Sequence, residues 1–133
     1  MLVLSALSQP ALAQSDEAIE VMEDYLMFAN YEAGIILPAQ IDQTIFDAVL
    51  FVDTRDAEQF EAETIPGAIN IEWREVLAER DSLPSDQKMV LFCNTGSLSS
   101  QALFALRVAG FDNAVVMQTG FNGWKETAAY KPE

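Results

Sequence analysis

The chain has 133 residues, a length that fits one domain with a substantial hydrophobic core better than two. Half of its residues are apolar, yet no segment approaches the roughly 18 consecutive apolar residues that a membrane span needs. Only 7 basic residues oppose 21 acidic ones, which excludes the basic surface that nucleic-acid binding demands.

The chain contains no histidine, and Cys93 is its single cysteine. The absence of imidazole excludes Ser-His-Asp and Cys-His catalytic groups and histidine-rich metal sites. A single cysteine also excludes an internal disulfide and a thiolate zinc cage. The sequence therefore predicts no metal site and no cofactor, and any cysteine chemistry must use a free thiol.

The N-terminal segment "MLVLSALSQPALAQS" is short and apolar and ends in the small-residue pattern Ala11-Leu12-Ala13 of a signal-peptidase site. No basic residues precede it. We interpret residues 1–13 as a truncated signal peptide, which predicts a periplasmic or otherwise exported protein in an oxidising compartment. The alternative is a hydrophobic arm that stays on the protein.

The next segment, residues 14–34, is predicted to be an N-terminal helical extension. Ser15 or Asp16 can cap a helix there, and Gly34 can stop it. Apolar residues recur at helical spacing among acidic ones: Ile19, Met22, Leu26 and Ala29. The pattern indicates an amphipathic helix over residues 15–31.

From residue 35 to 130, apolar runs alternate with helical patterns. The runs are residues 35–37, "AVLFVDTR" (48–55), "KMVLFC" (88–93) and "NAVVM" (113–117). The helical segments are a turn led by Pro38 and residues 56–63, 73–81, 99–109 and 121–129. Continuous apolar runs are typical of parallel strands buried on both faces. The order predicts an α/β domain whose parallel sheet carries helices on both faces.

Two of the predicted strands end in a residue that can carry out chemistry: one in a carboxylate and the other in a thiol. Cys93 ends one strand and Asp53 ends another, so both should lie at the sheet edge where ligands bind in such folds. The polar segment after Cys93 should turn at Gly96 and enter a helix at about Leu98 or Ser99. Amides of such a loop and a helix N-terminus stabilise a thiolate. The same pattern also fits an inert buried cysteine, so the residues alone leave both interpretations open.

Three segments, in this order, resemble the signatures of the rhodanese family. They are "FVDTRDAEQFEAETIPGAINI", which resembles the first signature, "CNTGSLS", which is similar to the active-site loop C-x-x-G-x-R-S, and "TGFNGW", which resembles the closing G-G-x-x-x-W. The resemblance implies a three-layer α/β/α rhodanese-like fold with a five-stranded parallel sheet over residues 35–130. It also implies sulfur transfer through a cysteine persulfide.

The resemblance assigns roles to individual residues. Cys93 would be the nucleophile that forms the persulfide, and Asp53 and Arg55 would form an ion pair that supports the site, or a purely structural pair at a strand end. The loop that surrounds the sulfur would consist of Asn94, Thr95, Gly96, Ser97, Leu98 and Ser99. The implied partners are a sulfur donor, which could be a persulfide, thiosulfate or a protein, and a thiol acceptor.

The sequence departs from the family pattern at four positions. Leu98 replaces the loop arginine, Thr64 the histidine of the first signature and Glu63 the glycine before it, and Thr119 replaces the first glycine of the closing segment. Losing one charge-assisted hydrogen bond of about 1–3 kcal/mol should weaken binding of the thiosulfate dianion roughly ten- to a hundredfold. We therefore expect poor turnover of thiosulfate and better use of a persulfide.

Other functions stay open. Leu98 could mark a non-catalytic rhodanese-like module that binds a partner protein or a small anion. Related phosphatases and arsenate reductases have a loop one residue longer that ends in arginine, and Ser99 at that position argues against them. A redox-sensing thiol would have no resolving cysteine in the chain.

Overall fold

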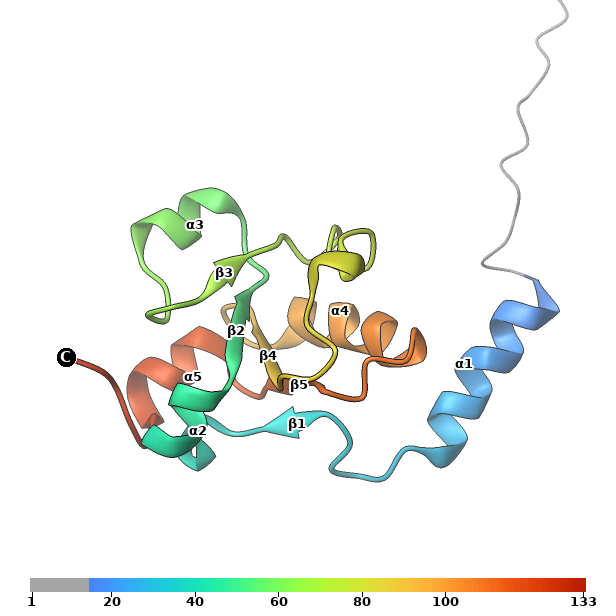
Figure 1. Cartoon of the computed structure of the whole chain (residues 1–133), viewed down its shortest axis with the longest axis horizontal. Helices are drawn as coiled ribbons and strands as arrows, with labels where there is room; N and C mark the ends of the chain where they lie inside the picture. Colours follow the sequence, from blue (N-terminus) through green and yellow to red (C-terminus); the bar gives the residue numbers. More distant parts are fainter. Residues whose placement is uncertain (1–14) are drawn as a thin grey trace, which may run out of the picture.

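The computed structural model describes residues 15–133, so the predicted signal peptide, residues 1–13, lies outside the described residues. Within them, five parallel strands form one sheet in the order β1-β5-β4-β2-β3 (Figure 1). The strands are β1 (Ile35–Ile36), β2 (Leu50–Asp53), β3 (Ile69–Asn70), β4 (Met89–Phe92) and β5 (Ala114–Met117). The helices are α1 (Asp16–Phe28), α2 (Gln43–Ala48), α3 (Ala57–Ala62), α4 (Ser97–Val108) and α5 (Gly120–Thr127), with 3-10 turns η2 (Pro38–Gln40) and η3 (Arg80–Ser82).

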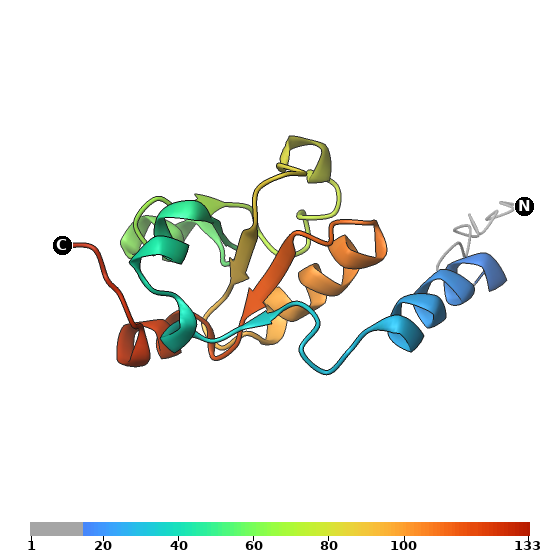
Figure 2. The same ribbon diagram turned by 60° about the horizontal axis from the view of Figure 1, so that its bottom comes forward.

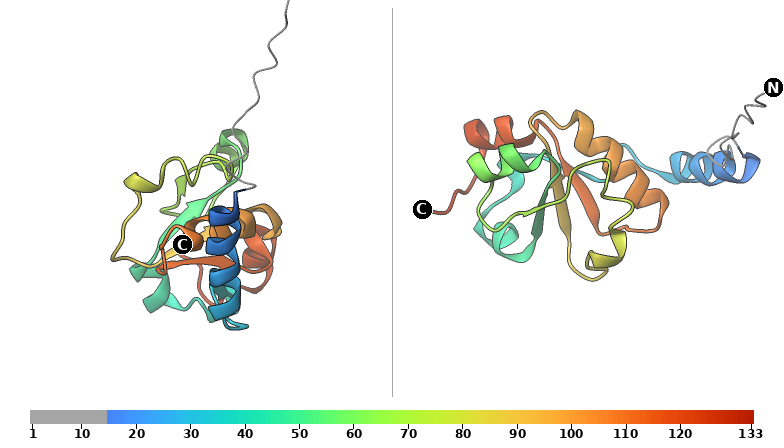
Figure 3. Two further views of the ribbon diagram at one scale, coloured as in Figure 1. Left: turned by 90° about the vertical axis from the view of Figure 1, so that its right-hand side faces the viewer. Right: turned by 90° about the horizontal axis from the view of Figure 1, so that it is seen from above.

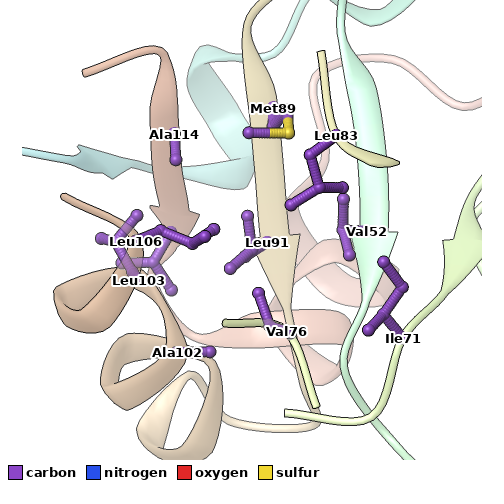
Figure 4. Packing of buried hydrophobic residues seen from close by; sticks show 11 residues of the cluster. Val52, Ile71, Val76, Leu83, Met89, Leu91, Ala102, Leu103, Leu106 and Ala114 are labelled. Atoms are coloured by element: carbon purple, nitrogen blue, oxygen red, sulfur yellow. The ribbon is translucent and has the colours of Figure 1, made fainter. Parts of the chain in front are cut away.

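Alternate residues of the central strand β4 point into two separate hydrophobic clusters. Met89 and Leu91 belong to the cluster beneath α4, part of which Figure 4 shows around β4. Val90 and Phe92 belong to the opposite cluster, which includes residues of α5. All four side chains are fully buried, and such burial contributes about 1.5–3 kcal/mol for each large apolar side chain. The predicted sheet with helices on both faces is confirmed.

The register of the sheet brings two of the predicted site residues to one edge. Asp53 of β2 pairs with Phe92 of β4, directly before Cys93. Thr54, which directly follows β2, donates both its amide (2.8 Å) and its hydroxyl (2.9 Å) to the Phe92 carbonyl. The ends of the two strands are therefore fixed to each other beside the cysteine.

The helix predicted over residues 73–81 is wrong. The segment forms a series of turns that ends in η3. Its backbone amides donate to carbonyls three residues back in some places and four residues back in others, so no continuous α-helix forms. The Trp73 amide donates to the Thr54 carbonyl at 2.9 Å, while Val76 and Leu83 enter the core. Strand β3 and helix α2, which Asp42 caps by accepting from the Ile45 amide, are additions that the sequence pattern did not predict.

Helix α1, predicted over residues 15–31, lies beyond α4 at the end of a loop that leads to β1 (Figures 2 and 3). No residue of α1 is buried. Its contact with α4 is made by Tyr25, whose ring lies edge-on to Phe104 and whose hydroxyl accepts a 3.1 Å hydrogen bond from Arg107. None of the helices described over residues 15–133 is long and apolar enough to cross a membrane.

Candidate active site

Cys93 follows β4 directly and is 4% exposed. Its Sγ accepts hydrogen bonds from the Gly96 amide (3.2 Å), the Ser99 amide (3.5 Å) and the Ser99 hydroxyl (3.3 Å). Gly96 has a φ of 102° and turns the chain into α4, so the first turn of this helix points at the sulfur. The partial positive charge of a helix N-terminus adds to the attraction for an anion there.

These contacts change the acidity of the thiol. Burial raises the pKa of the Cys93 thiol, but hydrogen bonds from the Ser99 hydroxyl and from the amides of Ser99, Thr95 and Gly96 outweigh it. The net result is a pKa below the usual value. More of the thiol is therefore present as the nucleophilic thiolate near neutral pH. These polar contacts to Sγ differ from the apolar surroundings of an inert core cysteine.

The Ser99 hydroxyl has a second acceptor besides the sulfur. Its Oγ lies 3.2 Å from the Gly96 carbonyl oxygen, and its single proton can be donated to only one of the two acceptors at a time. The Ser100 amide also donates to that carbonyl, at 3.0 Å. Ser99 itself is fully buried behind the sulfur and does not face the solvent.

Replacing Ser99 by alanine is expected to raise the pKa of Cys93 toward that of a free thiol. Below the pKa, alkylation by iodoacetamide should slow about two- to tenfold, the factor that corresponds to one lost hydrogen bond of about 0.5–1.5 kcal/mol. The pH profile of the alkylation rate measures this, and Ser100→Ala is the control because the Ser100 hydroxyl donates to Ser97 instead. An unchanged midpoint in Ser99→Ala would contradict the expectation.

A buried ion pair lies beside the cysteine loop. Arg55 Nη2 lies 2.7 Å from Asp53 Oδ2, and the Asp53 side chain is fully buried. The Thr64 hydroxyl donates to the same carboxylate oxygen at 2.8 Å. Thr64, which stands where the family has histidine, thereby fixes the orientation of Asp53. Buried ion pairs need such extra hydrogen bonds to offset the cost of desolvation.

The ion pair also reaches the loop around the sulfur. Arg55 Nη1 donates to the side-chain carbonyl of Asn94 at 3.3 Å, and the Asn94 amide group donates to Gln59 of α3 at 2.7 Å. The guanidinium group lies over the ring of Phe121, 4.6 Å from its centre. Arg55 thus connects the end of β2, the cysteine loop and α5.

The cysteine opens into a cavity of about 380 Å³. Its lining consists of Thr54, Arg55, Asp56, Gln59, Glu72, Trp73, Arg74, Cys93, Asn94, Thr95 and Leu98. Gly96 and Ser97 line a different hollow next to Thr119, and Asp53 lies buried behind Arg55. The cavity therefore holds only part of the predicted loop.

Six residues of this lining were not predicted from the sequence: Thr54, Asp56, Gln59, Glu72, Trp73 and Arg74. Thr54, Asp56 and Gln59 follow β2 inside the segment that resembles the first family signature, whereas Glu72, Trp73 and Arg74 follow β3 just after that segment. No group of three or more metal-ligating side chains occurs among residues 15–133.

Helix α5 closes the other side of the loop. The Phe121 amide donates to the Cys93 carbonyl at 2.7 Å, and the Asn122 amide donates to the Asn94 carbonyl at 3.1 Å. The turn before this helix contains Thr119 with a φ of 71°, which among the described residues is the single non-glycine residue with positive φ. A β-branched residue is strained in this region.

We expect Thr119→Gly to raise the free energy of unfolding by about 0.5–1 kcal/mol. Relief of roughly 1–2 kcal/mol of backbone strain should exceed the entropic cost of a glycine. Urea unfolding measures the change, and Thr119→Ala, which keeps a Cβ at the same φ, should gain less. A Thr119→Gly protein less stable than the wild type would show that contacts of the threonine side chain outweigh the strain.

A five-stranded parallel sheet with a cysteine before the helix that follows its central strand is the architecture that the resemblance to the rhodanese family implied. The chain belongs to the rhodanese-like domain family, whose match covers residues 37–127. The thiosulfate sulfurtransferase GlpE of Pseudomonas savastanoi pv. phaseolicola is 26% identical over 92 residues, which are 69% of this chain and 87% of that protein.

This chain spans about a fifth of the length of larger relatives that it matches. The adenylyltransferase and sulfurtransferase UBA4 of Lodderomyces elongisporus is 34% identical over 85 residues, covering 56% of this chain and 19% of that protein. Among solved structures, a rhodanese-related protein from Thermoplasma volcanium superposes with a TM-score of 0.63 at 26% identity and covers 68% of this chain and 89% of its own. The human single-domain sulfurtransferase TSTD1 has the same fold, with a TM-score of 0.62 at 23% identity over 71% of this chain and 96% of its own.

Proposed function

We propose that this protein is a sulfurtransferase that carries sulfane sulfur as a persulfide on Cys93. The observation that carries the proposal is the set of three hydrogen bonds to Sγ at the N-terminus of α4, on a cysteine that lines a cavity. Membership in a family that includes sulfurtransferases supports it. Asn94, held by Arg55 and Gln59, would keep the loop in place.

The reaction takes two displacements. The Cys93 thiolate attacks the outer sulfur of the donor, and the donor's sulfur–sulfur bond breaks. Its electron pair leaves with a thiolate, or with sulfite when the donor is thiosulfate. The acceptor thiolate then attacks the outer sulfur of the Cys93 persulfide and regenerates the Cys93 thiolate. The amides of Gly96 and Ser99 stabilise the anionic sulfur in both steps.

The proposed donor is a persulfide, either a small organic one or one on a protein, rather than thiosulfate. Leu98 lines the cavity at the loop position where the family has a basic residue, and Leu98 is 43% exposed. An apolar side chain at this place gives no charge-assisted hydrogen bond to a dianion. We propose, as the second partner, a thiol that accepts the sulfur from the Cys93 persulfide.

Intact mass spectrometry tests the proposed function. The purified protein is treated with an organic persulfide or with thiosulfate and then with cyanide. We expect the mass of one sulfur atom to be gained from the persulfide and removed by cyanide, and Cys93→Ala to gain nothing. No gain from any donor would reject the sulfurtransferase function.

That negative result would favour a second function, a non-catalytic module that binds a partner protein or a small anion. The substitution of the loop arginine by Leu98 is the observation in its favour. Such a module should keep its binding when Cys93 is replaced by serine. A sulfurtransferase should lose transfer in the same variant.

We also propose that the protein is exported, with residues 1–13 as part of its signal peptide. The small-residue pattern Ala11-Leu12-Ala13 supports this proposal. Cell fractionation combined with the mass of the N-terminal peptide would test it. A cytosolic protein that keeps residues 1–13 would overturn it.

A further inference from the structure

Two cations line the Cys93 cavity, and they differ in their surroundings. Arg55 is buried, and Asp53 neutralises its charge. Arg74 comes from the segment after β3, and its side chain is 72% exposed. Because Leu98 carries no charge, Arg74 is the exposed cation of this cavity lining.

The contacts of Arg74 leave most of its hydrogen-bonding capacity unused. Its Nε donates to both carboxylate oxygens of Glu72, at 3.1 and 3.0 Å. Its terminal nitrogens Nη1 and Nη2 have no hydrogen-bond partner among the described residues. A guanidinium group binds a carboxylate or another oxyanion with two parallel N–H donors, so an anion can be added while Glu72 keeps its contact.

Arg74 also lies where two hollows meet. A second hollow of about 590 Å³ extends along α4 and shares Trp73 and Arg74 with the Cys93 cavity. Its lining is mainly apolar and includes Leu77, Phe104 and Ala105. Because the two hollows share Trp73 and Arg74, a ligand that placed its sulfur at Cys93 and its carbon body in the second hollow would contact Arg74.

We propose that Arg74 is a specificity-determining residue that binds an anionic group of the sulfur donor or acceptor. The preferred ligand class is an organic thiol or persulfide that carries a carboxylate near its sulfur and has an apolar body. The proposal deepens the proposed function and rests on it for the identity of the ligands. Its core, an anion-binding Arg74 beside Cys93, can be tested without sulfur transfer.

The test compares alkylation of Cys93 by iodoacetate and by iodoacetamide, which differ in charge. Because Cys93 is the single cysteine of the chain, intact mass reports modification of this thiol. We expect Arg74→Gln to slow iodoacetate about two- to tenfold and to leave iodoacetamide unchanged. Glu72→Gln should change the iodoacetate rate in the opposite direction, because it removes a carboxylate next to Arg74.

Arg80→Gln is the matched control. It removes the same charge from an exposed arginine outside the cavity lining, whose Nη1 donates to the Leu77 carbonyl. If the iodoacetate rate fell equally in Arg74→Gln and Arg80→Gln, the change in the net charge of the protein would explain the effect, and the proposal would be overturned. An iodoacetate rate that did not change in Arg74→Gln would also overturn it.

Acceptor selectivity gives a second measurement. In the persulfide-loaded protein, Arg74→Gln should raise the KM for 3-mercaptopropionate severalfold, leave kcat unchanged and have no effect on the methyl ester of that thiol. An equal effect on acid and ester would count against carboxylate binding. Failure of the wild type to load sulfur would reject the proposed function, whereas charge-selective alkylation in the same protein would still support the anion site.

Discussion

Gly120→Ala is expected to lower the free energy of unfolding by about 2–5 kcal/mol and to abolish most sulfur loading. Gly120 has a φ of 61°, and a Cβ built there would lie 2.4 Å from the Cys93 carbonyl oxygen and 2.6 Å from the Asn94 carbonyl carbon. Both atoms belong to the backbone of the loop that contains Cys93. They cannot shift to make room for a Cβ unless the Cys93 sulfur shifts as well. The hydrogen bonds from Phe121 and Asn122 to the same carbonyls would be disturbed together.

Urea unfolding followed by circular dichroism measures this loss, and intact mass after treatment with a persulfide measures the loading. Gly110→Ala is the matched control because Gly110 also has a positive φ, 102°, but a Cβ there would meet nothing within 4 Å. Gly110→Ala should lower the free energy of unfolding only by the cost of a Cβ at positive φ, about 1 kcal/mol. Equal losses in the two variants would mean that contact with the cysteine loop contributes nothing.

Leu98→Arg should raise kcat/KM for thiosulfate about ten- to a hundredfold, the factor expected for a charge-assisted hydrogen bond of about 1–3 kcal/mol. Leu98 lies in the first turn of α4 and lines the cavity of Cys93, so a guanidinium on this position can reach a bound dianion. The thiosulfate-to-cyanide assay measures the gain. The gain should fall as salt concentration rises, because added ions screen an exposed charge.

Leu98→Gln is the control for this prediction. Glutamine is also polar and unbranched but uncharged, so its kcat/KM for thiosulfate should remain within a few fold of the wild type. If both variants gained equally, polarity rather than charge would limit thiosulfate use. If neither gained, the low activity expected for the wild type would have to arise elsewhere in the site.

The parts of the fold that the sequence predicted are those where burial alone determines structure. The apolar runs that end at Asp53 and Cys93 correspond to β2 and β4, because strands buried on both faces admit few polar residues. Parallel pairing then places both ends at one edge, which the register confirms. Cys93 and its loop could therefore be located before the structure was known.

Other residues of the cavity lining could not be found in this way. Trp73 and Arg74 come from a segment whose helical pattern was misleading, since the Trp73 amide is used by the Thr54 carbonyl and not by a helix. Gln59 contacts Asn94 across 35 positions of sequence. Such contacts depend on how distant segments pack, and local periodicity contains no information about them.

The single proton of the Ser99 hydroxyl allows the site to respond to the charge on the sulfur. An anionic sulfur is the stronger acceptor for this proton, whereas a neutral sulfur is a weak acceptor and leaves the Gly96 carbonyl as the better partner. The Ser100 amide keeps its bond to that carbonyl in either case, so the first turn of α4 stays closed. In the proposed sulfur transfer, the alternation between charged and neutral sulfur would thus require only rotation about the C–O bond of Ser99, and the backbone could remain fixed.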